Sequence, residues 1–150
     1  MTKDEYRQYA AGFFNKKRTL LIEGVDKEYL TRLSKAGYVY MKNLLQAGRT
    51  KTDRQKLSAE LDIPYETLHR IIRCCDMAQI VGLSGKVLKY IYELGYHSIA
   101  AYSQADPEEI NRQALAYLSA IGKKPTLPVC SRPGNWVEDA KLVDSLIEAD

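Results

Sequence analysis

A gapless internal repeat constrains the fold of this 150-residue chain more than any other feature. Residues 22–48 align with residues 80–106 over 27 positions, at a constant offset of 58 residues. Chance matching at average composition gives roughly one or two identities over such a length. Seven positions are identical here, and they are Ile22/Ile80, Gly24/Gly82, Leu30/Leu88, Gly37/Gly95, Tyr38/Tyr96, Gln46/Gln104 and Ala47/Ala105. The repeat therefore predicts two similar structural units.

Each copy has the pattern of a glycine-containing turn that leads into a helix. Apolar residues then recur at the spacing of one helical face. Asp26 and Ser84 occupy the position of a helix N-cap, and Gly37 and Gly95 the position of a left-handed residue that ends the helix. The sequence thus indicates a turn, a helix, a glycine stop and a second short helix in both copies.

A tight glycine turn before a helix is the centre of the helix-hairpin-helix motif, and both copies resemble it. That motif usually carries a second glycine where this chain has Asp26 or Ser84, with Gly85 one position later. The order of segments over roughly residues 21–143, with a tryptophan-bearing helix near the end, is similar to a family of uncharacterised bacterial proteins. These have tandem helix-hairpin-helix units and are catalogued as a domain of unknown function. The resemblance implies a compact all-helical fold and nucleic-acid binding, without an established activity.

We therefore expect an all-α fold with two pseudo-repeated helix-hairpin-helix units packed as one compact domain, residues 1–150. An N-terminal helix is expected within residues 1–18. The first unit and its connector helices are expected in residues 20–79, and the second unit with the C-terminal helices in residues 80–150. A chain of this length is sufficient to bury one core.

The first helix is predicted from a capping box. Thr2 and Glu5 have the required spacing, which favours a helix over residues 3–15. This helix either closes one end of the core or forms a homodimer contact through its apolar face, which consists of Tyr6, Tyr9, Ala10, Phe13 and Phe14.

Other start and stop signals divide the rest of the chain. Thr52 or Asp53 is expected to cap the next helix, and residues 56–72 have the pattern of helix, turn and helix. Asp106 followed by Pro107 predicts a further helix start. Residues 123–134 contain three prolines and are expected to form a loop. Beyond this loop we expect a last helix, capped by Asn135, with inward-facing Trp136, Ala140, Val143 and Ile147.

The sequence predicts a soluble protein of the cytoplasm, from its composition and its cysteines. Apolar residues make up 45% and charged residues 27%, as in ordinary globular proteins. No apolar run approaches the ~20 residues of a membrane span, and charged residues interrupt the start of the chain where a signal peptide would be apolar. The three cysteines are an odd number and include an adjacent pair, which favours a reducing compartment over a disulfide framework.

Charge is distributed unevenly along the sequence. The net charge of +3 combines +6 in residues 1–75 with −3 in residues 76–150. The basic half could bind an anionic partner. Alternatively, the difference in net charge between the halves could be only an uneven distribution of charge on a solvated surface.

The second glycine turn is the better candidate for a nucleic-acid-binding site. A helix-hairpin-helix holds a phosphate through backbone N–H groups at the start of its second helix, where the helix dipole favours an anion. In the first turn, Asp26 would occupy those N–H groups with its own carboxylate and repel phosphate. In the second turn the N–H groups stay available and two lysines follow, so the predicted binding residues are Gly82, Ser84, Gly85, Lys86 and Lys89.

Two other interpretations involve macromolecular partners. Gly24 and Gly82 could serve only close helix packing, which would make the chain a structural or protein-interaction adaptor without nucleic-acid binding. A second possibility is that residues 65–73 enter a DNA groove like the recognition helix of a helix-turn-helix, rather than act as a plain connector. Such a helix would present Tyr65, His69, Arg70 and Arg73.

The sequence gives no sign of an enzyme or a cofactor. It contains no phosphate-binding loop, dinucleotide fingerprint or paired nucleophile and base, and no small-molecule substrate is evident. No metal site is expected either, because the available ligands lack a recognised spacing, and these are His69, Cys74, Cys75, His97 and Cys130.

Overall fold

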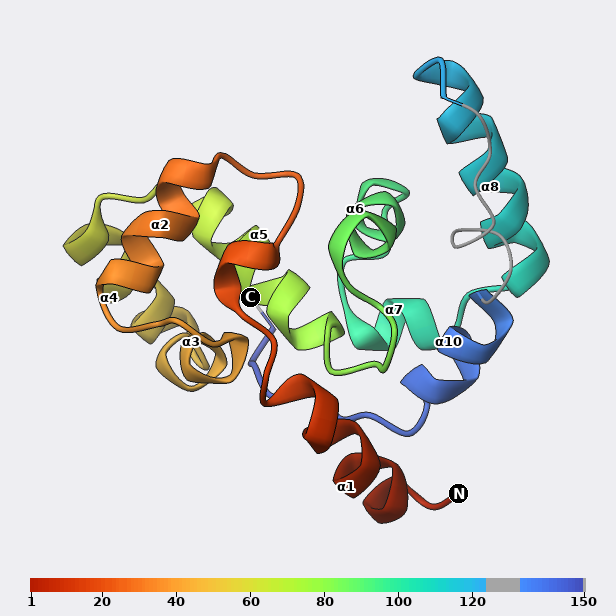
Figure 1. Cartoon of the computed structure of the whole chain (residues 1–150), viewed down its shortest axis with the longest axis horizontal. Helices are drawn as coiled ribbons and strands as arrows, with labels where there is room; N and C mark the ends of the chain where they lie inside the picture. The colour runs from red at the N-terminus through yellow and green to blue at the C-terminus, as the bar shows by residue number, and fades with distance from the viewer. Residues whose placement is uncertain (124–132, 150) are drawn as a thin grey trace.

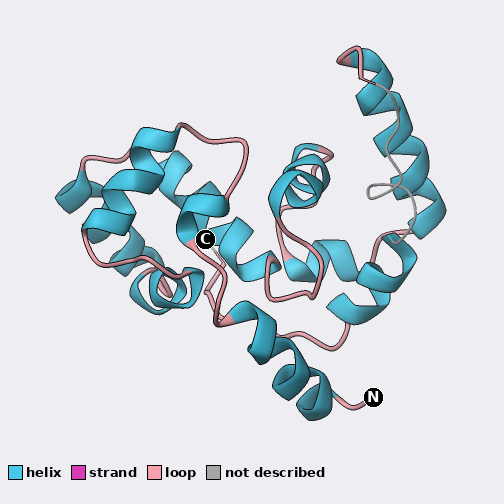
Figure 2. Ribbon diagram, in the orientation of Figure 1, coloured by secondary structure: helices cyan, strands magenta, loops and turns pink. Residues whose placement is uncertain are grey.

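The structure, a computed structural model, describes residues 1–123 and 133–149, and it confirms the all-helical prediction (Figures 1 and 2). Within these ranges no β-strand forms, and the β-type pairing found there is an isolated antiparallel bridge between Arg18 and Tyr40. The elements are α1 (Lys3–Phe14), a 3-10 turn η1 (Thr19–Leu21), α2 (Lys27–Lys35), α3 (Met41–Ala47), α4 (Lys51–Leu61), α5 (Tyr65–Met77), α6 (Gly85–Glu93), α7 (Ile99–Ser103), α8 (Pro107–Ala120) and α10 (Pro133–Ala140).

The helices are arranged around α5. Figure 1 shows α2, α3 and α4 on one side of this helix and α6, α7, α8 and α10 on the other, with α1 at one end of the molecule. Six residues of α5 have an exposure of 1% or less, namely Leu68, Ile71, Ile72, Cys74, Cys75 and Met77. The helix therefore lies at the centre of the compact core.

Helices α2 and α6 begin and end at positions 58 residues apart, which is the offset of the sequence repeat. Each follows a glycine in the left-handed region, Gly24 with φ 89° and Gly82 with φ 85°. Glycine is the residue that adopts such angles without steric cost. The turns before the two helices therefore have the same backbone requirement.

The ends of these two helices also match. Gly37 and Gly95 have φ of 108° and 107°. Beyond them, the Tyr38 amide donates to the Leu33 carbonyl at 3.0 Å, and the Tyr96 amide to the Ile91 carbonyl at 3.4 Å. This is the usual way in which a left-handed glycine satisfies the last carbonyls of a helix. The predicted glycine stops are confirmed.

Matching residues from the two stretches enter one hydrophobic cluster. The pairs are Leu30/Leu88, Leu33/Ile91 and Met41/Ile99, and all six side chains are buried. A small separate cluster contains Tyr90, Ala114 and Leu118, through which α8 packs on α6. Burial of these apolar faces supplies the main stabilising free energy.

The structure confirms the predicted cap of α1, but only part of the predicted apolar face of this helix is buried. The Glu5 amide donates to Thr2 Oγ1 at 3.1 Å, as a capping box requires. On the apolar side the residues that become buried are Tyr6, Ala10 and Phe14. Tyr9 and Phe13 remain 50% and 49% exposed. Part of the expected core face therefore stays at the surface.

Two predicted helix boundaries are wrong. Thr50, not Thr52 or Asp53, caps α4, because its hydroxyl accepts the Asp53 amide at 3.1 Å. The last helix begins at Pro133, before the expected cap Asn135, and ends at Ala140. The loop expected over residues 123–134 lies mostly outside the described residues.

Tertiary hydrogen bonds explain why the chain leaves the helix after Ala140. The Leu146 amide donates to Asp76 Oδ1 at 2.9 Å, and Ser145 Oγ donates to Asp76 Oδ2 at 2.6 Å. The Glu148 amide donates to the Arg49 carbonyl at 2.8 Å. Burial raises the pKa of Asp76, and these hydrogen bonds oppose that shift. The terminal segment is therefore tied to α5 and to the turn before α4.

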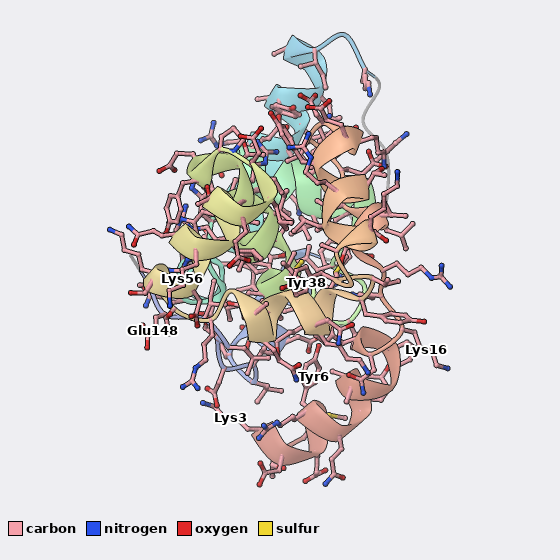
Figure 3. The ribbon with its side chains drawn as sticks, turned by 90° about the vertical axis from the view of Figure 1, so that its left-hand side faces the viewer. Lys3, Tyr6, Lys16, Tyr38, Lys56 and Glu148 are labelled. Atoms are coloured by element: carbon pink, nitrogen blue, oxygen red, sulfur yellow. The ribbon has the colours of Figure 1, made fainter. Side chains whose placement is uncertain are left out.

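A buried arginine also holds the terminal segment in place through hydrogen bonds. Arg54 has no exposed surface. Its guanidinium donates to the carbonyl oxygens of Gly48 at 3.0 Å, Arg49 at 3.1 Å and Glu148 at 2.9 Å. One side chain thus joins the turn between α3 and α4 to the end of the chain (Figure 3, where Glu148 is labelled).

We expect Arg54→Met to lower the free energy of unfolding by about 3 kcal/mol, because it leaves buried carbonyl groups without donors. Chemical denaturation followed by circular dichroism measures this change. Arg49→Met is the matched control: that side chain is exposed, and its carbonyl is untouched, so a change within about 0.5 kcal/mol is expected. Equal losses in the two variants would contradict the role given to Arg54.

Candidate nucleic-acid interface

The second glycine turn, residues 80–84, connects α5 to α6 and is held in place from one side. The Val81 amide donates to the hydroxyl of Tyr6 on α1 at 3.0 Å, and the Leu83 amide donates to the Ile80 carbonyl at 3.1 Å. Gly85, the first residue of α6, is left-handed with φ 59°. The turn therefore has a fixed shape before the helix starts.

The first amides of α6 have no partner in the described parts of the chain. Ser84 is the N-cap, in an extended conformation, and its side chain makes no capping hydrogen bond. Among the described residues, the amides of Ser84, Gly85 and Lys86 make no hydrogen bond. A helix N-terminus with free N–H groups carries partial positive charge. This geometry is suited to hydrogen bonding with an anion.

Lys86 and Lys89 follow on the same face of α6, because residues three apart are neighbours on a helix surface. Lys86 is exposed, whereas Lys89 is partly buried, with its ammonium 5.9 Å from the centre of the Tyr90 ring. Burial opposes ionisation of Glu93, but hydrogen bonds from Tyr117 and Arg70 and the charge of Lys89 lower its pKa overall. Glu93 therefore offsets part of the positive charge beside Lys89.

The first glycine turn also leaves the amides of Asp26, Lys27 and Glu28 without hydrogen bonds among the described residues, and it differs from the second in its neighbours. Asp26 is the N-cap of α2, but its carboxylate makes no capping hydrogen bond, so the expectation that it fills those amides is wrong. Instead the turn lies against two cationic side chains. A Cβ built on Gly24 would be 2.6 Å from Arg70 Nη2 and 3.2 Å from Lys89 Cγ.

Trp136 of α10 packs against the second turn. A Cβ built on Gly82 would be 3.1 Å from Trp136 Nε1, and the indole itself is buried. Gly82 thus permits close packing as well as the left-handed turn. Sequence reasoning placed Trp136 in the core but had no signal that paired it with this glycine.

Two arginines of α5 extend the basic surface next to α6. Arg70 Cζ lies 4.8 Å from the centre of the Tyr92 ring, and Arg70 Nη2 is 3.4 Å from Glu93 Oε1. Tyr92 stacks on His97 with 4.1 Å between ring centres. Burial lowers the pKa of His97, and the positive charges of Arg73 and Arg70 add to this effect. His97 therefore favours its neutral form in a basic neighbourhood.

The alternative of a groove-reading helix is wrong for one of its four residues. His69 is only 2% exposed, and its ring lies 5.5 Å from that of Tyr65. A buried histidine is not available to a DNA groove. Arg70 and Arg73 are partly exposed, and Arg70 lies beside Glu93 of α6.

Two further findings concern metal binding and membrane crossing in the described residues. No three side chains of histidine, cysteine, aspartate or glutamate gather there in a way that could hold a metal ion. Cys130, one of the ligands considered from the sequence, lies outside the described residues. No helix within residues 1–123 or 133–149 has the length and apolar character that crossing a membrane requires.

We expect Gly82→Ala to alter the fluorescence of Trp136, the single tryptophan of the chain, because the added methyl group meets the indole. Gly24→Ala is the matched control, with nearly the same backbone angle but no tryptophan beside it. Left-handed strain should lower the free energy of unfolding by about 1–2 kcal/mol in both variants. Identical emission spectra of Gly82→Ala and wild type would contradict the contact.

Comparisons with known proteins identify a family. No curated protein and no solved structure matches the sequence. The sequence model of one family matches residues 23–143, which includes both glycine turns and α10. The chain therefore belongs to the family described as a domain of unknown function, DUF4332.

Proposed function

We propose that this protein is a non-catalytic module that binds DNA through the backbone amides of its second glycine turn. The observation that supports this function best is the set of amides at Ser84, Gly85 and Lys86, which lack partners among the described residues. The amides belong to the start of α6, where the helix dipole favours a phosphate. Contacts with phosphates carry no base information, so the binding is largely independent of sequence.

The proposal treats the two repeated stretches as pseudo-symmetric helix-hairpin-helix units within a single cytoplasmic domain. In its favour, α2 and α6 share their bounds at the 58-residue offset, and the glycines before and after them share their backbone angles. Contributions of both stretches to one hydrophobic cluster favour a single domain. The free thiols of Cys74 and Cys75 suit a reducing compartment.

The positive side chains around α6 supply the electrostatic part of the proposed binding. Lys86 and Lys89 lie on α6, and Arg70 and Arg73 lie on the adjoining α5. Neutralising phosphates with such cations releases counterions from DNA, which makes the affinity fall as salt rises. Glu93 limits the local charge, so the affinity should be moderate and strongly dependent on salt.

We expect Lys86→Glu combined with Lys89→Glu to abolish binding to duplex or branched DNA at low salt, as measured by gel shift. Acidic residues are compatible with the first turns of a helix, so the fold should persist. The matched control is Lys51→Glu with Lys56→Glu, which makes the same change in net charge on the distant helix α4 (Figure 3, where Lys56 is labelled). This control should retain binding.

Two results would count against the DNA proposal. Wild-type protein without salt-dependent binding would exclude it. Equal loss in the α4 control would show that binding follows net charge rather than the second turn.

A second candidate function is a protein-interaction adaptor that does not bind nucleic acid. The contact between Trp136 and Gly82 favours it, because close packing alone accounts for a glycine at that position. Absence of DNA binding by the wild-type protein at low salt, with its fold intact, would select this adaptor function.

A further inference from the structure

Helix α1 presents an uncovered aromatic face. Figure 1 shows this helix at one end of the molecule, with the N-terminus pointing away from the other helices. Tyr6, Ala10 and Phe14 pack inward, whereas Tyr9 and Phe13 are 50% and 49% exposed. Most exposed apolar side chains on proteins are scattered singly, but these two adjoin each other.

The exposed rings are part of an ordered aromatic row. The ring centres of Tyr6 and Tyr9 lie 6.2 Å apart, and those of Tyr9 and Phe13 lie 5.3 Å apart, both in edge-to-face arrangements. Tyr6 anchors the row, since its hydroxyl accepts the Val81 amide. Aromatic side chains held in this way lose little conformational entropy on binding, which suits them to an interface.

Residues of opposite charge lie at the two ends of the exposed aromatic stripe, which consists of Tyr9 and Phe13. Glu5 precedes Tyr9 by four residues, so these two lie on one side of the helix. Lys16 lies in the turn that follows Phe13 and the last helical residue, Phe14. Glu5 and Lys16 are both exposed. No salt bridge to either residue occurs within the described residues. The neighbouring Lys17 is engaged elsewhere, because its Nζ donates to the Ala78 carbonyl at 2.6 Å.

Gly12 leaves room beside these rings. A Cβ built on Gly12 would meet no atom within 4 Å, so the space next to the backbone is open. A glycine on a helix surface allows a second helix to approach closely. The stripe therefore combines apolar area, end charges of opposite sign and a close-approach point.

We propose that α1 is a self-association surface on which a second copy of this chain docks, with the two α1 helices antiparallel. In an antiparallel pair the acidic start of each helix lies beside the basic end of the other. The two-fold axis makes every such contact occur twice. In this register Glu5 of one copy faces Lys16 of the other. Tyr9 of one copy packs beside Gly12 and Phe13 of the other.

Charge complementarity selects a second copy over an unrelated partner. The stripe is acidic at one end and basic at the other, so it complements itself only in the antiparallel orientation. A parallel arrangement would place Glu5 beside Glu5 and Lys16 beside Lys16, which is repulsive. The dimer is independent of the DNA proposal, since none of its five contact residues, Glu5, Tyr9, Gly12, Phe13 and Lys16, belongs to the second glycine turn.

Sedimentation velocity over a concentration series tests the dimer directly. We expect a concentration-dependent dimer for the full-length wild-type chain. Tyr9→Ala and Phe13→Ala should each raise the dimer dissociation constant about tenfold or more, as truncation of an aromatic anchor does. Circular dichroism should show an unchanged helix content in both variants. Leu115→Ala, which alters an exposed apolar side chain of α8, is the control and should leave the dissociation constant unchanged.

A charge swap tests the register of the two helices. Lys16→Glu alone should weaken the dimer, and adding Glu5→Lys should restore it, because the pair then has opposite charges again. Circular dichroism of the double variant checks that α1 stays helical without the hydrogen bond between Thr2 and the Glu5 carboxylate. Lys35→Glu on α2 is the control for net charge and should have no effect. A wild-type protein that stays monomeric at its highest soluble concentration would overturn the proposal. So would a dimer insensitive to Tyr9→Ala and Phe13→Ala, or one that the charge swap does not restore.

Discussion

Left-handed backbone at four glycines is the constraint on which the arrangement of α2 and α6 depends. Gly24 and Gly82 precede these helices, and Gly37 and Gly95 follow them, all with φ between 85° and 108°. A side chain with Cβ would be strained at such angles, so each glycine fixes the residue at which the chain changes direction. Each helix consequently starts and ends at a defined residue, and its buried side chains enter the same hydrophobic cluster as those of α5.

The sequence predicted those elements whose determinants are local. Glycine spacing, the Thr2 cap and the Asp106–Pro107 start all act within a few residues, and the structure contains each of them. The terminal segment was mispredicted as helix because its partners are distant. Asp76 and Arg54 hold it by hydrogen bonds across 70 and 94 positions of the chain, and such tertiary bonds override helical propensity.

The candidate interface likewise contains residues that the sequence predicted and residues that it did not. The residues of the second turn were named from the sequence because they are contiguous, and their backbone leaves amides unpaired in the described structure. Trp136 and Arg70 reach the two glycine turns through tertiary packing, which no local pattern records. Asp26 was misjudged because an N-cap position does not guarantee a capping hydrogen bond. The exposure of Tyr9 and Phe13 likewise depends on where α1 docks.

Amide NMR during titration with a short DNA duplex at low salt tests the central claim most directly. It observes the backbone groups of Ser84, Gly85 and Lys86 themselves, without substitution of any side chain. The account predicts saturable shifts of these three amides, with smaller changes at the matching positions of the first turn. Binding that leaves all three amide signals unchanged at saturation would contradict the claim that these groups contact the phosphate.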